Sequence, residues 1–321
     1  MHIVFGTGPL GYWVAQTLAE QGKKVTMVNR TGRLSQPLLQ QAFPNRINIM
    51  AGDATDPDCV YQICKGADAV FFCAMPPYTH WPELFPPLIK SLIEGISRAQ
   101  APLIYGDNLY MYGNTMGQAM VENMPYAATG HKGKVRAEMA NMLMQAHRAG
   151  TINVAIGRAS DFYGPRVCNA TIGDAFFQAV CTGKTANLVG DIHQPHSYTY
   201  IKDFAKSLVI LSQHQQAFGQ TWHVPSAPMI STQQLIKIIE QETGSPIKVR
   251  ISGRKMIAFL GFFHAMIREL KETMYTWEQP HIVDHNKFAQ AFGIDVTPHA
   301  IAIRETLAWY RRKSGSNINF K

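Results

Sequence analysis

Residues 2–22 are the feature that most limits how this chain can fold. The run "HIVFGTGPLG" (2–11) contains the apolar residues of a buried strand, followed at once by a glycine-rich turn. The next run, "PLGYWVAQTLAEQG" (9–22), has the apolar spacing of a helix, with Pro9 near its start and Gly22 at its end. A strand, a glycine turn and a helix in this order begin a βαβ unit, which requires a parallel partner strand.

The same alternation continues through the first half of the chain. Strand-like apolar runs occur at 24–29, 47–52, 67–74, 101–107 and 152–159, and helical patterns occur at 56–66, near 81–98 and at 130–149. Strands that alternate with helices at this spacing predict an α/β fold with a doubly wound parallel sheet, covered by helices on both faces. After Pro165 the pattern becomes irregular, which is typical of a smaller second domain.

The glycine turn "GTGPLG" (6–11) matches the pattern G-x-G-x-x-G. This pattern is informative here because it follows a predicted strand and opens a predicted helix. One glycine permits the tight turn, one lets a pyrophosphate approach the backbone, and one brings the helix close to the strand. The sequence therefore predicts a dinucleotide-binding turn formed by Gly6, Thr7, Gly8, Leu10 and Gly11.

The end of the second predicted strand, "MVNRTGR" (27–33), bears on the choice of dinucleotide. An acidic residue at this point would bind both ribose hydroxyls of NAD, but the chain has Asn29 and Arg30, with Arg33 close behind. Arginine can bind a 2′-phosphate, so NADP is the preferred cofactor and NAD is possible. Further cofactor contacts are expected from loops that follow two other strands, at Asp53, Cys73 and Ala74.

These motifs predict two domains. Residues 1–165 form a Rossmann-type dinucleotide-binding domain, to which a segment of about 196–225 returns. Residues 166–195 and 226–321 form a smaller α/β domain that binds the substrate.

Composition limits the classes of partner. The 321 residues carry a net charge of +8, but the cations are scattered apart from 132–136 and 311–313, which favours a small anionic ligand over nucleic acid.

Five cysteines without a C-x-x-C pair indicate reduced thiols, and hence a cytoplasmic protein. The longest apolar run, 256–267, is too short to span a membrane and predicts a buried helix or a pocket lid. No nucleic-acid or membrane partner is expected.

Three further motifs, together with the glycine turn, carry a family resemblance. They are "YGDNLYMYG" (105–113), "GRASDFYGP" (157–165) and "HSYTYIKDFA" (196–205). Their order and spacing resemble the extended branch of the short-chain dehydrogenase/reductase superfamily, whose members include NAD-dependent epimerases and dehydratases. The resemblance runs from Met1 to about Trp309. It implies a Rossmann fold and redox chemistry with a nicotinamide dinucleotide.

The resemblance also implies a catalytic Ser or Thr, a Tyr and a Lys, and the chain departs from all three. The corresponding positions are Asn108, Lys132 and Arg136. Arg136 is expected to bind the nicotinamide ribose, as the family's lysine does. Lys132 could be a general acid or base, a charged donor that binds a substrate anion, or a structural surface cation. Asn108 could polarise a carbonyl oxygen, or could only shape the turn after its strand.

The remaining motif residues suggest a substrate pocket with Tyr112, Asp161 and His196, near Arg158. Family enzymes that act on sugar nucleotides usually bind a diphosphate with arginine where this chain has His196, which argues against such a substrate. No metal site is expected from the histidines, because no two of them share ligand spacing with a carboxylate.

We therefore expect an NAD(P)-dependent oxidoreductase or epimerase/dehydratase-like enzyme, which acts on a small polar carbonyl or alcohol without the usual Ser-Tyr-Lys set. The alternative is a catalytically silent NADP-binding sensor, which the loss of all three expected residues would favour. The Met-rich helix at 138–146 either packs in the core or forms a homodimer.

Overall fold

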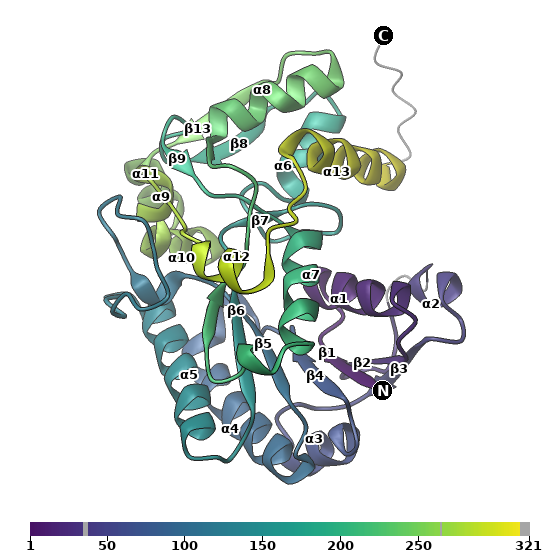
Figure 1. The fold of residues 1–321 in the computed structure, drawn as a ribbon. Coiled ribbons are helices and arrows are strands. Elements are labelled where there is room, and N and C mark those ends of the chain that lie inside the picture. The colour runs from purple at the N-terminus through teal and green to yellow at the C-terminus, as the bar shows by residue number, and fades with distance from the viewer. Residues whose placement is uncertain (35–37, 264, 315–321) are drawn as a thin grey trace. The chain divides into compact units, whose positions relative to one another are not determined.

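The computed structural model describes residues 1–34, 38–263 and 265–314 (Figure 1). The chain divides into two compact units by its internal contacts. Unit 1 comprises Met1–Met111, His131–Ala159 and Phe204–Val224, and unit 2 comprises Tyr112–Gly130, Ser160–Asp203 and the chain from Pro225 onward. Segments 112–130, 160–165 and 196–203, which the sequence analysis places with the first domain, group with unit 2.

Unit 1 is built on a seven-stranded sheet in which all neighbouring strands are parallel. The strand order is β11-β6-β5-β4-β1-β2-β3. The strands are β1 (His2–Phe5), β2 (Val25–Asn29), β3 (Ile47–Ala51), β4 (Ala69–Phe72), β5 (Leu103–Asp107), β6 (Val154–Arg158) and β11 (Thr221–His223). The first six strands have the order of a doubly wound dinucleotide-binding fold, which confirms the predicted fold class.

Helices cover both faces of this sheet, so its central strands are buried on both sides. The helices are α1 (Pro9–Glu20), α2 (Leu38–Ala42), α3 (Pro57–Cys64), α4 (Trp81–Ala99), α5 (His131–Arg148) and α7 (Ile201–Ser212). Figure 1 shows α1 and α7 on one side, with α3, α4 and α5 on the other. All four residues of β4 and all five of β6 are buried, because each side of these strands packs against helices.

Unit 2 combines three short two-stranded sheets with helices. Its strand pairs are β7 (Phe162–Tyr163) with β10 (Thr199–Tyr200), β9 (Pro195–His196) with β12 (Ile230–Ser231), and β8 (Ala186–Val189) with β13 (Val249–Ser252). Its helices are α6 (Asp174–Cys181), α8 (Thr232–Thr243), α9 (Arg254–Leu260), α10 (Ala265–Thr273), α11 (Tyr275–Glu278), α12 (Asn286–Phe292) and α13 (His299–Ser314). Ser231 begins α8 with a reciprocal capping box to Gln234, and Gly244 ends it in a left-handed conformation.

The apolar run at 256–267 does not form the buried helix expected from its composition. Phe259, Phe262 and Phe263 are 60%, 84% and 72% exposed, and residue 264 lies outside the described chain. The run is divided between α9 and α10, so no continuous apolar face is made that could be buried as one element. Among the described residues, no helix is long and apolar enough to cross a membrane.

Candidate functional site

The turn between β1 and α1 needs glycine at two positions for steric reasons. Gly6 has a φ of 100°, and a Cβ atom there would lie 2.7 Å from the backbone nitrogen of Ala74. A Cβ atom on Gly11 would lie 1.9 Å from the carbonyl oxygen of Gly6. Both glycines therefore allow the backbone of the turn to pack against itself and against the loop after β4.

Gly8 differs from these two glycines, because a Cβ atom at this position would meet nothing within 4 Å. Gly8 is the N-cap residue of α1, and the first turn of the helix has no acidic residue and no side-chain cap at its N-terminus. The space beside Gly8 therefore lies at the N-terminus of α1, the positive end of the helix dipole, which suits a phosphate group. These features fit a dinucleotide pyrophosphate.

Replacing Gly8 with alanine should weaken dinucleotide binding at least tenfold without reducing stability to a similar degree. The reason is that the new methyl group would occupy the space above the turn, while the φ of −71° suits any residue. Affinity can be measured by nicotinamide fluorescence, and stability by thermal unfolding.

The matched control is Gly253→Ala, because Gly253 is also an N-cap glycine with nothing within 4 Å of an added Cβ atom. This variant should bind dinucleotide like the wild type. An unchanged affinity in Gly8→Ala would mean that the phosphates do not approach this turn.

The end of β2 is organised by Asn29. Its amide nitrogen donates to the Thr7 hydroxyl at 3.0 Å and to the Arg33 carbonyl at 2.8 Å, and its amide oxygen accepts from the Gly32 backbone at 2.8 Å. Asn29 thus ties the glycine turn to the loop after β2. Arg30 and the side chain of Arg33 remain exposed at this edge of the sheet.

Two neighbouring loops lie at the same edge of unit 1. The Asp53 carboxylate accepts hydrogen bonds from the Thr55 backbone at 2.9 Å and the Thr55 hydroxyl at 2.7 Å. These bonds, the backbone one above all, hold the pKa of Asp53 below its usual value, and the charge of Arg30 adds to the effect. Burial raises the pKa of the Cys73 thiol, so this side chain stays protonated and is no candidate nucleophile.

A buried ion network joins the carboxyl ends of β5 and β6. Asp107 and Arg158 are directly paired in the strand register, and the Arg158 Nε atom donates to the Asp107 carboxylate at 3.1 Å. Arg136 on α5 donates to the other carboxylate oxygen at 3.2 Å and to the Tyr105 hydroxyl at 3.4 Å. Asp107 balances one of these two arginine charges and was not among the site residues predicted from the sequence.

Aromatic rings just before and within the first turns of α4 lie against two cations of α5, Lys132 and Arg136. The Arg136 guanidinium lies 4.4 Å from the centre of the Trp81 ring and 4.6 Å from that of Phe85, while the Lys132 ammonium lies 4.4 Å from the centre of the Tyr78 ring. Lys132 is 2% exposed and Arg136 is 6% exposed. The reading of Lys132 as a surface cation is therefore wrong, whereas its two functional readings both remain.

Asn108, the third expected catalytic position, takes part in the turn after β5. Its side-chain oxygen accepts a hydrogen bond from the Tyr110 backbone at 3.2 Å. The turn role considered for this residue is therefore present. The bond uses the amide oxygen and leaves the amide nitrogen as the group that could donate to a substrate.

The predicted substrate residues Tyr112, Asp161 and His196 lie in unit 2. Tyr112 is 1% exposed and packs edge-on against Tyr126, with 5.9 Å between the ring centres. His196 Nε2 lies 3.0 Å from the Asp161 carboxylate, and His281, which the sequence analysis did not identify, lies beside them.

Burial and the close packing of these side chains shift the pKa values of Asp161 and His281. Burial is the largest influence and acts to raise the pKa of Asp161, but the hydrogen bond with His196 and the electrostatic effects of His196 and His281 together keep the pKa below its usual value. Burial lowers the pKa of His281 to about 3, so its imidazole is neutral.

Comparison with solved structures identifies the same fold in several enzymes. UDP-glucuronic acid 4-epimerase from Bacillus cereus, solved with NAD, has a TM-score of 0.77 at 16% identity, and the match covers 98% of this chain and 99% of that one. dTDP-glucose 4,6-dehydratase from Streptomyces venezuelae, solved with NAD and TYD, has a TM-score of 0.80 at 18% identity and covers 100% of both chains. UDP-glucose 4-epimerase from Bifidobacterium longum, solved with NAD⁺ and UDP, has a TM-score of 0.77 at 16% identity, covering 98% of this chain and 99% of that one. These identities support a common fold and carry no information on substrate.

A search of curated proteins finds no match. The NAD dependent epimerase/dehydratase family matches residues 3–224, which is more than half of the chain. This match agrees with the parallel sheet and the glycine turn of unit 1. The chain belongs to the NAD dependent epimerase/dehydratase family.

Proposed function

We propose that this protein is an NADP-dependent oxidoreductase or epimerase/dehydratase-like enzyme that acts at an alcohol or carbonyl group of a small polar substrate. The bound dinucleotide would accept or supply the hydride. The chain's own contribution would be to hold the cofactor at the α1 turn and to polarise the substrate oxygen with Lys132. The observation that carries this proposal is the burial of the Lys132 ammonium against the Tyr78 ring.

The position of Lys132 supports this role. Arg136 reaches Asp107, the last residue of β5, so the first turn of α5 lies at the carboxyl edge of the sheet. Ligands of open parallel α/β sheets bind at this edge. The Lys132 ammonium is buried and lies 4.4 Å from the centre of the Tyr78 ring, and a buried positive group at this edge can stabilise a negative charge that develops on a substrate oxygen. Lys132 would either stabilise that charge or exchange a proton with the substrate oxygen.

The preference for NADP is supported by the loop after β2. Asn29 uses its side chain to shape this loop and offers no carboxylate to the ribose hydroxyls. Arg30 and Arg33 are exposed there, so either guanidinium could pair with a 2′-phosphate.

Replacing Arg30 with aspartate should weaken NADPH binding by about 10- to 100-fold, which corresponds to the loss of one charge-assisted hydrogen bond to phosphate. NADH binding should change by less than about threefold, because NADH lacks the 2′-phosphate. Fluorescence titration of the purified protein with each nucleotide measures both effects.

The control for a general change in charge is Lys90→Asp, which reverses an exposed cation on α4. Its two affinities should match those of the wild type. Equal losses of NADPH and NADH affinity in Arg30→Asp would show that Arg30 does not read the 2′-phosphate.

The second candidate function is an NADP sensor without turnover. Its support is that Asn108 and Arg136, two of the three expected catalytic positions, already make internal contacts. The test that separates the candidates is NADPH oxidation by the full chain against a panel of aldehydes, ketones and keto acids. Because an epimerase or dehydratase leaves the cofactor unchanged overall, the corresponding hydroxy compounds are also tested for epimerisation or loss of water with NADP⁺ present, and tight NADPH binding without any of these reactions would favour the sensor.

A further inference from the structure

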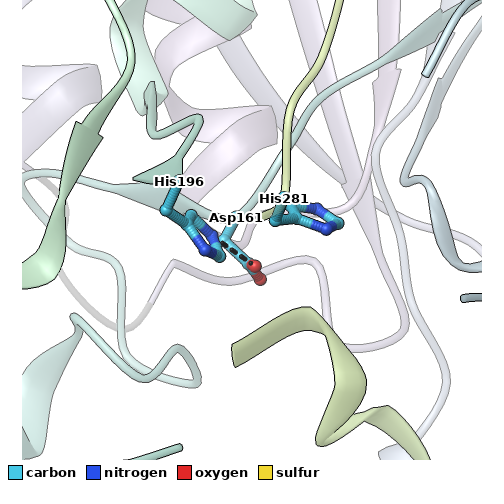
Figure 2. Close-up of side chains that lie close together, drawn as sticks. All are labelled: Asp161, His196 and His281. Carbon is cyan, nitrogen blue, oxygen red and sulfur yellow. Dashed lines mark hydrogen bonds and ion pairs between the residues drawn. The ribbon is translucent and has the colours of Figure 1, made fainter. Parts of the chain in front are cut away.

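Unit 2 brings together three side chains of the types that bind transition metals. Asp161 lies just before β7, His196 ends β9, and His281 follows α11. One ligand atom from each lies within 4.8 Å of the other two. Figure 2 shows the Asp161 carboxylate beside the His196 ring, with the His281 ring next to them.

Backbone hydrogen bonds fix the positions from which these side chains extend. His196 and His281 form a parallel β-bridge, in which Ser197 N donates to the His281 carbonyl and His281 N donates to the Pro195 carbonyl, each at 2.9 Å. The two imidazoles therefore stack, with 4.9 Å between their centres. Thr199 N donates to the Asp161 carbonyl at 3.0 Å, which places the carboxylate on the same small assembly of strands.

The ring of His281 is the feature that points to a ligand. This residue is 8% exposed, and one of its ring nitrogens lies within 4.8 Å of a ligand atom of Asp161 and of His196. The ring thus lies beside a carboxylate and stacks on a second imidazole, and one metal ion is a ligand that suits all three groups.

We propose that Asp161, His196 and His281 bind one divalent transition-metal ion of the Zn²⁺ class. Two imidazole nitrogens and one carboxylate oxygen form a ligand set that suits Zn²⁺ and Co²⁺ better than Mg²⁺ or Ca²⁺, which prefer oxygen ligands alone. The remaining coordination positions would take water or a ligand from solution. The site lies wholly within unit 2, so it is independent of the function proposed for unit 1.

The geometry requires a small adjustment on binding. Ligand atoms about 2.0–2.2 Å from a common ion lie roughly 3.0–3.5 Å apart, which is less than the 4.8 Å limit that encloses them here. His196 Nε2 must exchange its hydrogen bond to Asp161 for the ion, with the carboxylate then bound to the same centre. Trp277 and Tyr198 stack on the His196 ring, each with 4.5 Å between ring centres, and keep its plane in place during this exchange.

This inference reverses the expectation of no metal site. The expectation depended on spacing in the sequence, and residues 161, 196 and 281 have no ligand spacing that could be recognised. They become neighbours only through the β-bridge between His196 and His281.

The test is a titration of the metal-free full chain with Co²⁺, followed by visible absorption, and with Zn²⁺ in competition. We expect one ion per chain and a Co²⁺ spectrum with nitrogen ligands. His281→Ala should lower the affinity at least 100-fold, and Asp161→Asn, which can keep a hydrogen bond to His196, should lower it at least tenfold. The thermal midpoint of the wild type should rise with added Zn²⁺, and this rise should be lost in both variants.

The matched control is His193→Ala, which removes an exposed histidine of unit 2 that is hydrogen-bonded to Gln233 at 3.0 Å. It should bind both metals like the wild type. The proposal is overturned by an absence of stoichiometric binding, or by binding that survives in His281→Ala and Asp161→Asn. It is equally overturned if His193→Ala loses the metal to the same extent as these variants.

Discussion

Replacing Lys132 with methionine is expected to reduce turnover by about 100- to 1,000-fold, the usual effect of removing one donor that stabilises developing charge. Methionine has a similar length and apolar stem, so it can fill the buried space against Tyr78. NADPH affinity should stay within about threefold of the wild type, because the cofactor contacts proposed at the α1 turn and the β2 loop do not involve this side chain. Steady-state rates and fluorescence titration measure the two effects separately.

Lys134→Met is the matched control, since Lys134 is exposed on the same helix and two residues away. Its turnover and NADPH affinity should both equal those of the wild type. Full turnover in Lys132→Met would remove this residue from the mechanism, and a large loss of NADPH affinity would assign it to the cofactor instead. Lys132→Arg separates the two chemical roles, because arginine keeps a positive donor but cannot exchange a proton near neutral pH.

The fold of unit 1 could be predicted because its signals are local. Each central strand is a short run of consecutive apolar residues, since both of its faces are buried, and each is followed by a helix with its own apolar stripe. The glycine turn could also be predicted, because backbone crowding at Gly6 and Gly11 leaves no alternative residue. Unit 2 offered no such repeat: its strands are only two to four residues long, too short for a periodic signal.

The contacts that join the glycine turn to the loop after β2 are local in the sequence for the same reason. Thr7, Asn29 and Arg33 are brought together by one βαβ unit, so their order in the sequence reflects their position in space. Asp107 was missed because its importance depends on two arginines, Arg136 and Arg158, that follow it by 29 and 51 residues. A possible signal was the placement of an acid and a basic residue at the ends of adjacent predicted strands.

The aromatic support of the α5 cations was missed because it comes from another helix. Tyr78, Trp81 and Phe85 have the spacing of an apolar helix face, which predicts only burial. Their second role, holding the side chains of Lys132 and Arg136, is apparent only once α4 and α5 are packed together. The exposed aromatic residues of 256–267 are the opposite case, because hydrophobicity predicted burial that packing did not supply.

Replacing Asp107 with asparagine should lower the free energy of unfolding of unit 1 by about 3–5 kcal/mol, the usual cost of removing one partner from a buried ion pair. The carboxylate is 1% exposed and accepts from both Arg136 and Arg158. Its loss would leave two guanidinium groups at the ends of β5 and β6 without their shared counter-charge, in a region where water cannot solvate them. Urea unfolding followed by tryptophan fluorescence, which includes Trp81 beside Arg136, measures the change.

Asp58→Asn is the control for this prediction. Asp58 pairs with Arg98 at 2.6 Å, but its side chain is 77% exposed, so its loss should change stability far less than that of Asp107. Comparable losses in the two variants would mean that the Asp107 network is solvated like a surface pair. Asp107 also holds Arg136 on α5, so Asp107→Asn should displace the first turn of that helix, which carries Lys132, and thereby reduce turnover. Asp58→Asn should leave turnover unchanged. A stability loss with full turnover would separate the structural role of the network from the proposed active site.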